Sequence, residues 1–204
     1  NISGMKRLTL GSAAILGIST LVAGTSVNAQ ERPKPLMKDF MGINGHTIQF
    51  DAKLYAPVCR LVRDYHNLYW DVAGDTSRDT QFPLAGQKIK WEDKSGKWKS
   101  FDDVPNWQEI YGSWQEAGFE VDVCIQFGGL TLDKWKNPAE DAYRYGKAFA
   151  QYFGPSGEAK LATSVEIGNE PSATFQPEEH LVLFEVMARG IRDGDPNLKI
   201  LTAT

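Results

Sequence analysis

Short runs of alternating apolar and polar residues recur along the chain, and longer segments with helical spacing separate them. The clearest run covers residues 119–127, where every second side chain is apolar. Strict alternation of this kind predicts a β-strand with one buried face. Four further apolar runs have the length of strands, and they cover residues 40–44, 59–63, 162–168 and 199–203. The pattern therefore predicts five strands.

Three of the intervening segments predict helices. Residues 107–117 repeat apolar side chains at helical spacing, and Gly118 marks the end of that helix. At 137–140, Asn-Pro-Ala-Glu provides an N-cap residue, a proline for the first helical position and a glutamate for a capping box. A third helix opens at Pro177 with acidic residues in its first turn, and it ends at Gly194-Asp195-Pro196.

Strands that alternate with helices form a parallel sheet with helices packed outside it. This alternation does not by itself separate a closed barrel from an open, doubly wound sheet. A complete (β/α)8 barrel takes about 250 residues, so residues 41–204 have the length of about five of its units. Residues 70–105, rich in Gly, Asp, Lys and Trp, are a long insertion after the second strand.

The stretch 165–171, Val-Glu-Ile-Gly-Asn-Glu-Pro, carries the most chemical information. Its apolar run ends in Gly-Asn-Glu-Pro, so Asn169 and Glu170 fall at the carboxyl end of a strand, where barrels of this type place their active sites. A glycosidase needs one carboxyl group to protonate the leaving oxygen and a second to attack the sugar. The Asn169 amide provides a hydrogen-bond donor for the sugar 2-hydroxyl beside that acid.

This stretch resembles the Asn-Glu-Pro signature of clan A glycoside hydrolases, in which the glutamate is the acid/base and the asparagine holds the sugar. The resemblance covers roughly residues 41–204 and is greatest to family 39 enzymes and related β-agarases. Residues 42–46 are similar to the end of the first strand in these enzymes, which places His46 beside the sugar. Arg63 resembles the second-strand arginine that lies beneath the catalytic carboxylates.

The resemblance implies an α/β fold, a (β/α)8 TIM barrel of which only about the first five strands are present. The family's nucleophile is a glutamate at the end of the seventh strand, and the sequence contains no such strand. We therefore expect an N-terminal fragment of a retaining glycoside hydrolase, truncated before the nucleophile, with Glu170 as its acid/base. It needs no cofactor and no metal, and its partner is a poly- or oligosaccharide.

Several of these residues have a second interpretation. Trp70 and Trp135 follow strand ends and fit sugar stacking, although tryptophans more often belong to the core. Arg63 and Glu166 equally fit an ion pair inside the barrel, because a buried charge needs a partner. His46 fits the cap of a strand end, and Glu170 fits a solvated acid before a proline turn.

Two other functions use the same residues. A metal-dependent hydrolase would take its ligands from His46, Asp64, His66 and Glu170, although the sequence has no His-x-His pair and no His-Glu-x-x-His. A secreted carbohydrate-binding protein without catalysis would need only acidic residues and tryptophans.

The first 29 residues have the order of a secretory signal. Lys6 and Arg7 precede an apolar stretch over 8–22, and Val27-Asn28-Ala29 has the small residues that a signal peptidase reads. Cleavage after Ala29 would leave residues 30–204 as the barrel part of a secreted or periplasmic protein, with no membrane partner after cleavage. The apolar stretch is shorter than the roughly 20 residues of a membrane span. Residues 1–4 precede Met5 and are a further N-terminal extension.

Charge and cysteine content narrow the class of partner. The net charge is −4 and the chain has no basic cluster, which argues against nucleic acid. Two cysteines, Cys59 and Cys124, are too few for a disulfide framework, and both fall in apolar runs. We expect both to be buried free thiols.

Overall fold

The computed structural model describes residues 34, 36–47, 50–92, 95, 98–100, 103–171 and 175–202. All elements below belong to the unit that covers residues 35–204. The predicted signal sequence and its cleavage site lie outside the described residues. In the described part of the chain, no helix is long and apolar enough to cross a membrane.

The main sheet contains five parallel strands in the order β1-β2-β5-β6-β7. They are β1 (Gly42–Asn44), β2 (Leu61–Asn67), β5 (Glu120–Gln126), β6 (Ser164–Ile167) and β7 (Lys199–Thr202). This order follows the chain without a reversal, whereas a doubly wound sheet reverses at its switch point. Five parallel strands that alternate with helices in chain order match the first five units of a (β/α)8 barrel, which confirms the predicted fold class.

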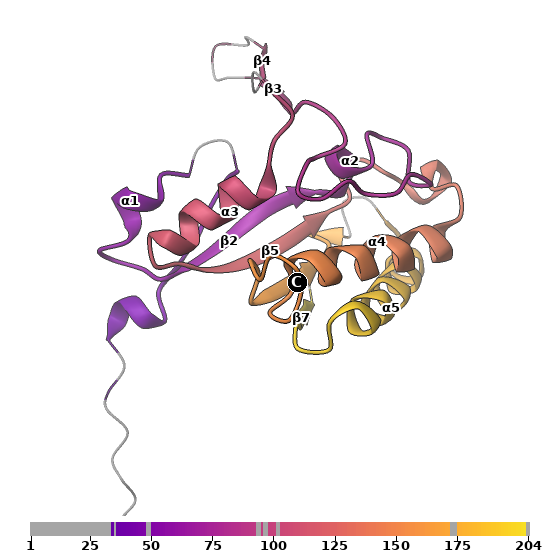
Figure 1. The fold of residues 1–204 in the computed structure, drawn as a ribbon. Helices are drawn as coiled ribbons and strands as arrows, with labels where there is room; N and C mark the ends of the chain where they lie inside the picture. The colour runs from indigo at the N-terminus through magenta and orange to yellow at the C-terminus, as the bar shows by residue number, and fades with distance from the viewer. Residues whose placement is uncertain are drawn as a thin grey trace, which may run out of the picture. The chain divides into compact units, whose positions relative to one another are not determined.

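Helices fill the connections between the strands (Figure 1). The helices are α1 (Ala52–Tyr55), α2 (Leu68–Asp71), α3 (Trp107–Glu116), α4 (Pro138–Phe153) and α5 (Pro177–Gly194), with short 3-10 turns at η1 (Met37–Asp39) and η2 (Leu132–Lys134). The three longer helices are the three that the spacing predicts. α4 and α5 lie side by side (Figure 1).

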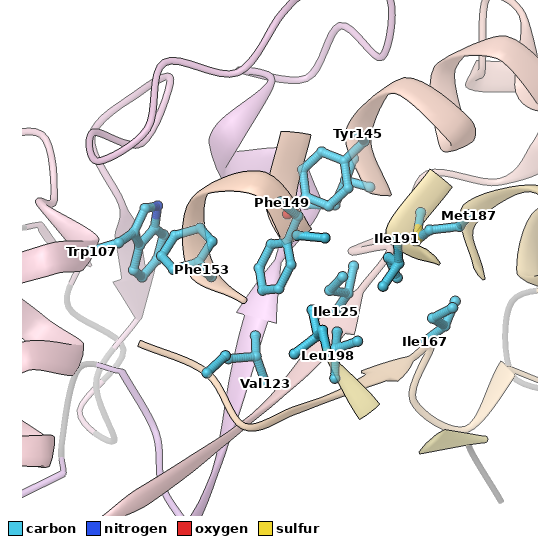
Figure 2. Packing of buried hydrophobic residues seen from close by; sticks show 14 of the residues in the cluster. Trp107, Val123, Ile125, Tyr145, Phe149, Phe153, Ile167, Met187, Ile191 and Leu198 are labelled. Carbon is cyan, nitrogen blue, oxygen red and sulfur yellow. The ribbon is translucent and has the colours of Figure 1, made fainter. Parts of the chain in front are cut away.

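One face of the sheet is covered by these helices and forms the core. Figure 2 shows Phe149 and Phe153 of α4 and Ile191 of α5 close to Val123 and Ile125 of β5. All five side chains are fully buried. The opposite face carries polar residues instead, among them Arg63, Asp122 and Glu166. In a barrel this second face is the interior, which agrees with the helices packing outside.

The start of α4 differs from the expectation. Pro138 does occupy its first turn, but the Asn137 side chain makes no capping hydrogen bond. Instead, the Asn137 backbone N–H donates to Asp141 Oδ2 at 3.0 Å. The Asp141 carboxylate is buried, and it also accepts from the Thr76 hydroxyl at 2.7 Å and from Arg144 Nη2 at 3.0 Å. Asp141 therefore takes the role that the sequence assigns to Glu140.

The insertion between β2 and α3 has structure that the pattern does not predict. It contains an antiparallel pair, β3 (Lys90–Glu92) with β4 (Trp98–Ser100). It returns to α3 through Asn106, whose side chain accepts from two backbone N–H groups of that helix. The capping signal at Asn106 is present in the sequence but was not among the predicted elements.

A buried polar cluster joins this insertion to the helix face of β2. Asp71 accepts from Trp107 Nε1 at 2.8 Å and from the Tyr145 hydroxyl at 2.7 Å, and it lies 2.6 Å from His66 Nε2. The Tyr111 hydroxyl links His66 Nδ1, at 2.8 Å, to Asp64 Oδ2, at 2.6 Å. Burial raises the pKa of both Asp64 and Tyr111 above their ordinary values.

Asp64 and His66, two of the ligands that a metal-dependent hydrolase would use, lie on the helix face of β2. Both side chains are fully buried against the helices. Successive residues of a strand point to opposite faces, so with Arg63 on the interior face its neighbour Asp64 and then His66 must face the helices. Cys59 and Cys124 are buried and free, as predicted.

Candidate active site

The turn after β6 holds the predicted acid. The strand ends at Ile167, and Gly168, Asn169 and Glu170 follow at its carboxyl end; we call these three residues the 168–170 turn. Gly168 has φ +87° and Glu170 has φ +44°, and the Glu170 side chain is exposed. A left-handed backbone at a non-glycine residue costs about 1–3 kcal/mol, and such residues concentrate at functional sites. The turn thus presents Glu170 to solvent at an energetic cost.

Arg63 ties this turn to the interior face of the sheet. Its Nη2 donates to Asn169 Oδ1 at 3.0 Å, and its Nε donates to Glu166 Oε2 at 2.5 Å. One guanidinium on β2 therefore orients the Asn169 amide and neutralises the Glu166 carboxylate. Burial disfavours the charged guanidinium, but the hydrogen bond and charge of Glu166 together with nearby Cys124 and Tyr65 outweigh it, so the pKa of Arg63 is raised.

Cys124 supports the same turn from β5. Its sulfur accepts from Arg63 Nη2 at 3.0 Å, and its S–H donates to the Gly168 carbonyl oxygen at 3.2 Å. Burial raises the pKa of the thiol to about 12, so the sulfur keeps its proton at neutral pH and acts as the donor. Backbone and side-chain contacts from three strands thus converge on the 168–170 turn.

The His180 ring packs against Gly168 in this turn, and sequence reasoning missed this contact. The residue lies in the first turns of α5, and its ring hydrogen-bonds to the backbone of Ile167. Its Nε2 is buried without a hydrogen-bond partner among the described residues. A Cβ on Gly168 would lie 2.9 Å from that nitrogen, so the ring fills the space that a side chain at 168 would need. Burial lowers the pKa of His180, which keeps the ring neutral.

A small hollow opens beside Asn169. Its volume is about 170 Å³, and it is lined by Gln126, Phe127, Gly128, Gly129, Asn169, Pro171 and Phe175. We call it the Asn169 hollow. It lies between the carboxyl ends of β5 and β6, which is the edge where a (β/α)8 barrel builds its active site. Gln126 and the two glycines were not among the predicted site residues, although they directly follow the best-patterned strand.

The remaining predicted residues fall in different surroundings. His46 is exposed after β1, with its ring centroid 6.4 Å from that of Tyr65, and Tyr65 in turn lies beneath the Arg63 guanidinium. Trp135 is only 5% exposed, and its indole N–H donates to the Leu130 carbonyl oxygen. Trp70 is half-buried, and its ring stacks on Trp107. A buried ring has no free face for a sugar, so the structure does not bring Trp135 into this site.

The four residues of the metal-dependent alternative are not brought together. Asp64 and His66 face the helices and are hydrogen-bonded there, whereas His46 and Glu170 are exposed. Among the described residues, no group of three or more His, Cys, Asp or Glu side chains is arranged to hold a metal ion.

Comparison with solved structures finds a similarity to a family 39 glycoside hydrolase from the gut symbiont Bacteroides cellulosilyticus WH2. The similarity covers 74% of this chain and 28% of that chain, with 10% sequence identity and a TM-score of 0.48. No protein-family model and no curated protein matches the chain. Similarity this distant carries no argument about function, so the candidate site rests on the geometry described above.

Proposed function

We propose that this chain is part of an exported, retaining glycoside hydrolase in which Glu170 is the acid/base. The observation that carries the proposal is the 168–170 turn: an exposed glutamate with a left-handed backbone at the carboxyl end of a parallel strand. Beside it, Arg63 holds the amide of Asn169 through its oxygen. That bond leaves the Asn169 amide N–H₂ free to donate to a sugar hydroxyl.

The proposed chemistry has two steps. In the first, Glu170 donates its proton to the glycosidic oxygen as the bond to the anomeric carbon breaks and a second carboxylate attacks that carbon. In the second, the Glu170 carboxylate takes a proton from a water molecule, which displaces the enzyme carboxylate and releases the sugar. By the clan pattern the nucleophile is a glutamate at the end of a seventh strand, which is not among the five strands of the described sheet. Glu166 does not suit that role, because Arg63 holds it on the interior face.

The test is Glu170→Gln in the full-length protein, with Glu185→Gln on the exposed side of α5 as a matched control. Turnover of substrates with poor leaving groups should fall by about 10²–10⁴-fold, the usual contribution of general acid–base catalysis. Substrates with good leaving groups should still form the intermediate, and added azide should release it as a glycosyl azide. Unchanged kinetics with both kinds of substrate would overturn the role of Glu170.

Export is proposed on the order of the leader residues alone. N-terminal sequencing of secreted material should begin at Gln30. Full-length material retained in the cytoplasm would contradict this part of the proposal without affecting the catalytic part.

The metal-dependent alternative is less well supported, because two of its four ligands face the opposite side of the sheet from the 168–170 turn. Activity that persists in the presence of a chelator would agree with the glycosidase. A carbohydrate-binding protein without catalysis would bind saccharides and show no turnover with any leaving group.

A further inference from the structure

A second, larger hollow adjoins the Asn169 hollow at Gly128 and Gly129, which line both. It has a volume of about 580 Å³ and lies over the carboxyl ends of β2 and β5. Its wall on the β2 side is formed by Tyr69, Gly74 and Asp75. We call it the Tyr69 hollow. The two hollows are therefore neighbours at the carboxyl ends of β2, β5 and β6.

Tyr69 lines this hollow, and two hydrogen bonds hold its backbone in place. The side chain is 40% exposed, which is unusual for a large ring in this molecule. The Tyr69 N–H donates to Asn67 Oδ1 at 3.0 Å, and the Tyr69 carbonyl oxygen accepts from Gly74 N–H at 3.0 Å. These two bonds hold the backbone from which the ring projects.

Gly74 allows the ring to lie against the main chain. Its φ is +78°, and a Cβ at this position would lie 2.9 Å from Tyr69 Cε2 and 3.0 Å from the hydroxyl oxygen. The Tyr69 ring thus packs against the main chain of Gly74. The part of Tyr69 that remains exposed contributes to the lining of the hollow. A flat apolar surface with a hydroxyl at its edge suits a ligand with both apolar and polar faces.

The rim of the Tyr69 hollow is polar and balanced in charge. It includes two acids, Asp75 and Asp133, and two bases, Lys134 and Lys136. Hydrogen bonds from Ser77 lower the pKa of Asp75, so it is a carboxylate at neutral pH. Lys134 Nζ donates to the Gly129 carbonyl oxygen at 2.8 Å. Equal numbers of acidic and basic groups favour a neutral ligand with many hydroxyls over an ion.

We propose that Tyr69 is the aromatic platform of a second sugar-binding subsite, which takes a neutral sugar unit of the chain that is cleaved at Glu170. The proposal rests on the proposed function and narrows its substrate to a chain of sugars that spans both hollows, as opposed to a single terminal unit. It replaces Trp135 as the stacking residue with one whose ring is accessible.

The experiment measures saccharide binding by calorimetry in the full-length protein that carries Glu170→Gln, so that the ligand is not cleaved. The probes are xylo-, cello- and agaro-oligosaccharides of increasing length. Affinity should rise with length for at least one series. Adding Tyr69→Ala should weaken binding of the longest member by about tenfold or more, the usual effect of losing an aromatic anchor. Tyr69→Phe should restore most of that affinity, because it keeps the ring.

Tyr143→Ala is the matched control, since the hydroxyl of this half-buried tyrosine on α4 donates to Asp193 on α5 and the residue lines neither hollow. It should leave binding unchanged. Equal affinity in the Tyr69→Ala and Tyr143→Ala proteins, or no binding in any series, would overturn the subsite. If saccharide binding depends on Tyr69 but turnover does not depend on Glu170, the subsite stands and the proposed catalytic role of Glu170 is wrong.

Discussion

Asp71→Ala removes the acceptor on which three buried donors depend. The Trp107 indole, the Tyr145 hydroxyl and the His66 imidazole all reach this carboxylate at 2.6–2.8 Å. The three donors come from α3, α4 and β2, so the carboxylate links the insertion to two of the helices that cover the sheet and to the sheet itself. With alanine at position 71, the three donors would be left without a partner in a region that excludes water.

The magnitude follows from the number of bonds. Leaving a buried donor without its acceptor costs about 1–3 kcal/mol, so three such donors amount to about 3–9 kcal/mol. Removing the carboxylate also removes the cost of its own burial, so the net loss lies in the lower part of that range. We expect the free energy of unfolding to fall by about 3–5 kcal/mol, a large part of the 5–15 kcal/mol typical of folded proteins.

Urea unfolding of the full-length protein, followed by tryptophan fluorescence, measures this change. With an m-value of about 2 kcal/mol/M, a loss of 4 kcal/mol lowers the midpoint by about 2 M. Asp71→Asn should cost less, because Tyr145 can turn its hydroxyl to accept from the amide and His66 can change tautomer. Asp79→Ala is the control, since that carboxylate is 89% exposed and should change stability by no more than about 0.5 kcal/mol. If Asp71→Ala shifts the midpoint no more than Asp79→Ala does, the cluster does not hold the insertion to the core.

Three further predictions concern the 168–170 turn. Arg63→Leu leaves the partly buried Glu166 carboxylate without its ion-pair partner and should cost about 1–3 kcal/mol of stability; the double variant with Glu166→Leu should recover part of that loss in urea unfolding, and an additive loss would contradict the pairing. Because burial raises the pKa of Cys124 to about 12, a thiol reagent at pH 8 should label it only after unfolding, and rapid labelling of the native protein would refute its burial. Burial lowers the pKa of His180, so its contribution to stability should be full above pH 6.5 and should decline as the pH falls through the folded-state pKa. His180→Gln should remove that decline, and identical stability–pH curves for variant and wild type would argue against it.

The sequence determined the five strands of the main sheet and the three longer helices, because both signals are local. Alternation over 119–127 and helical spacing over 107–117 each depend on neighbours within a few residues. The same local pattern located Glu170 at the end of a strand. Pairing of Arg63 with Glu166 also followed from the rule that a buried charge needs a partner, and the structure contains that pair.

Tertiary structure alone decided which side chains are accessible. Trp135 and Tyr69 both follow strand ends, yet Trp135 packs on Phe127 and is buried, whereas Tyr69 stays 40% exposed. Asp71 and Asp141 look like surface acids in the sequence, but donors from distant segments surround both. Local periodicity specifies the element and the face, whereas burial depends on what the rest of the chain brings to that face.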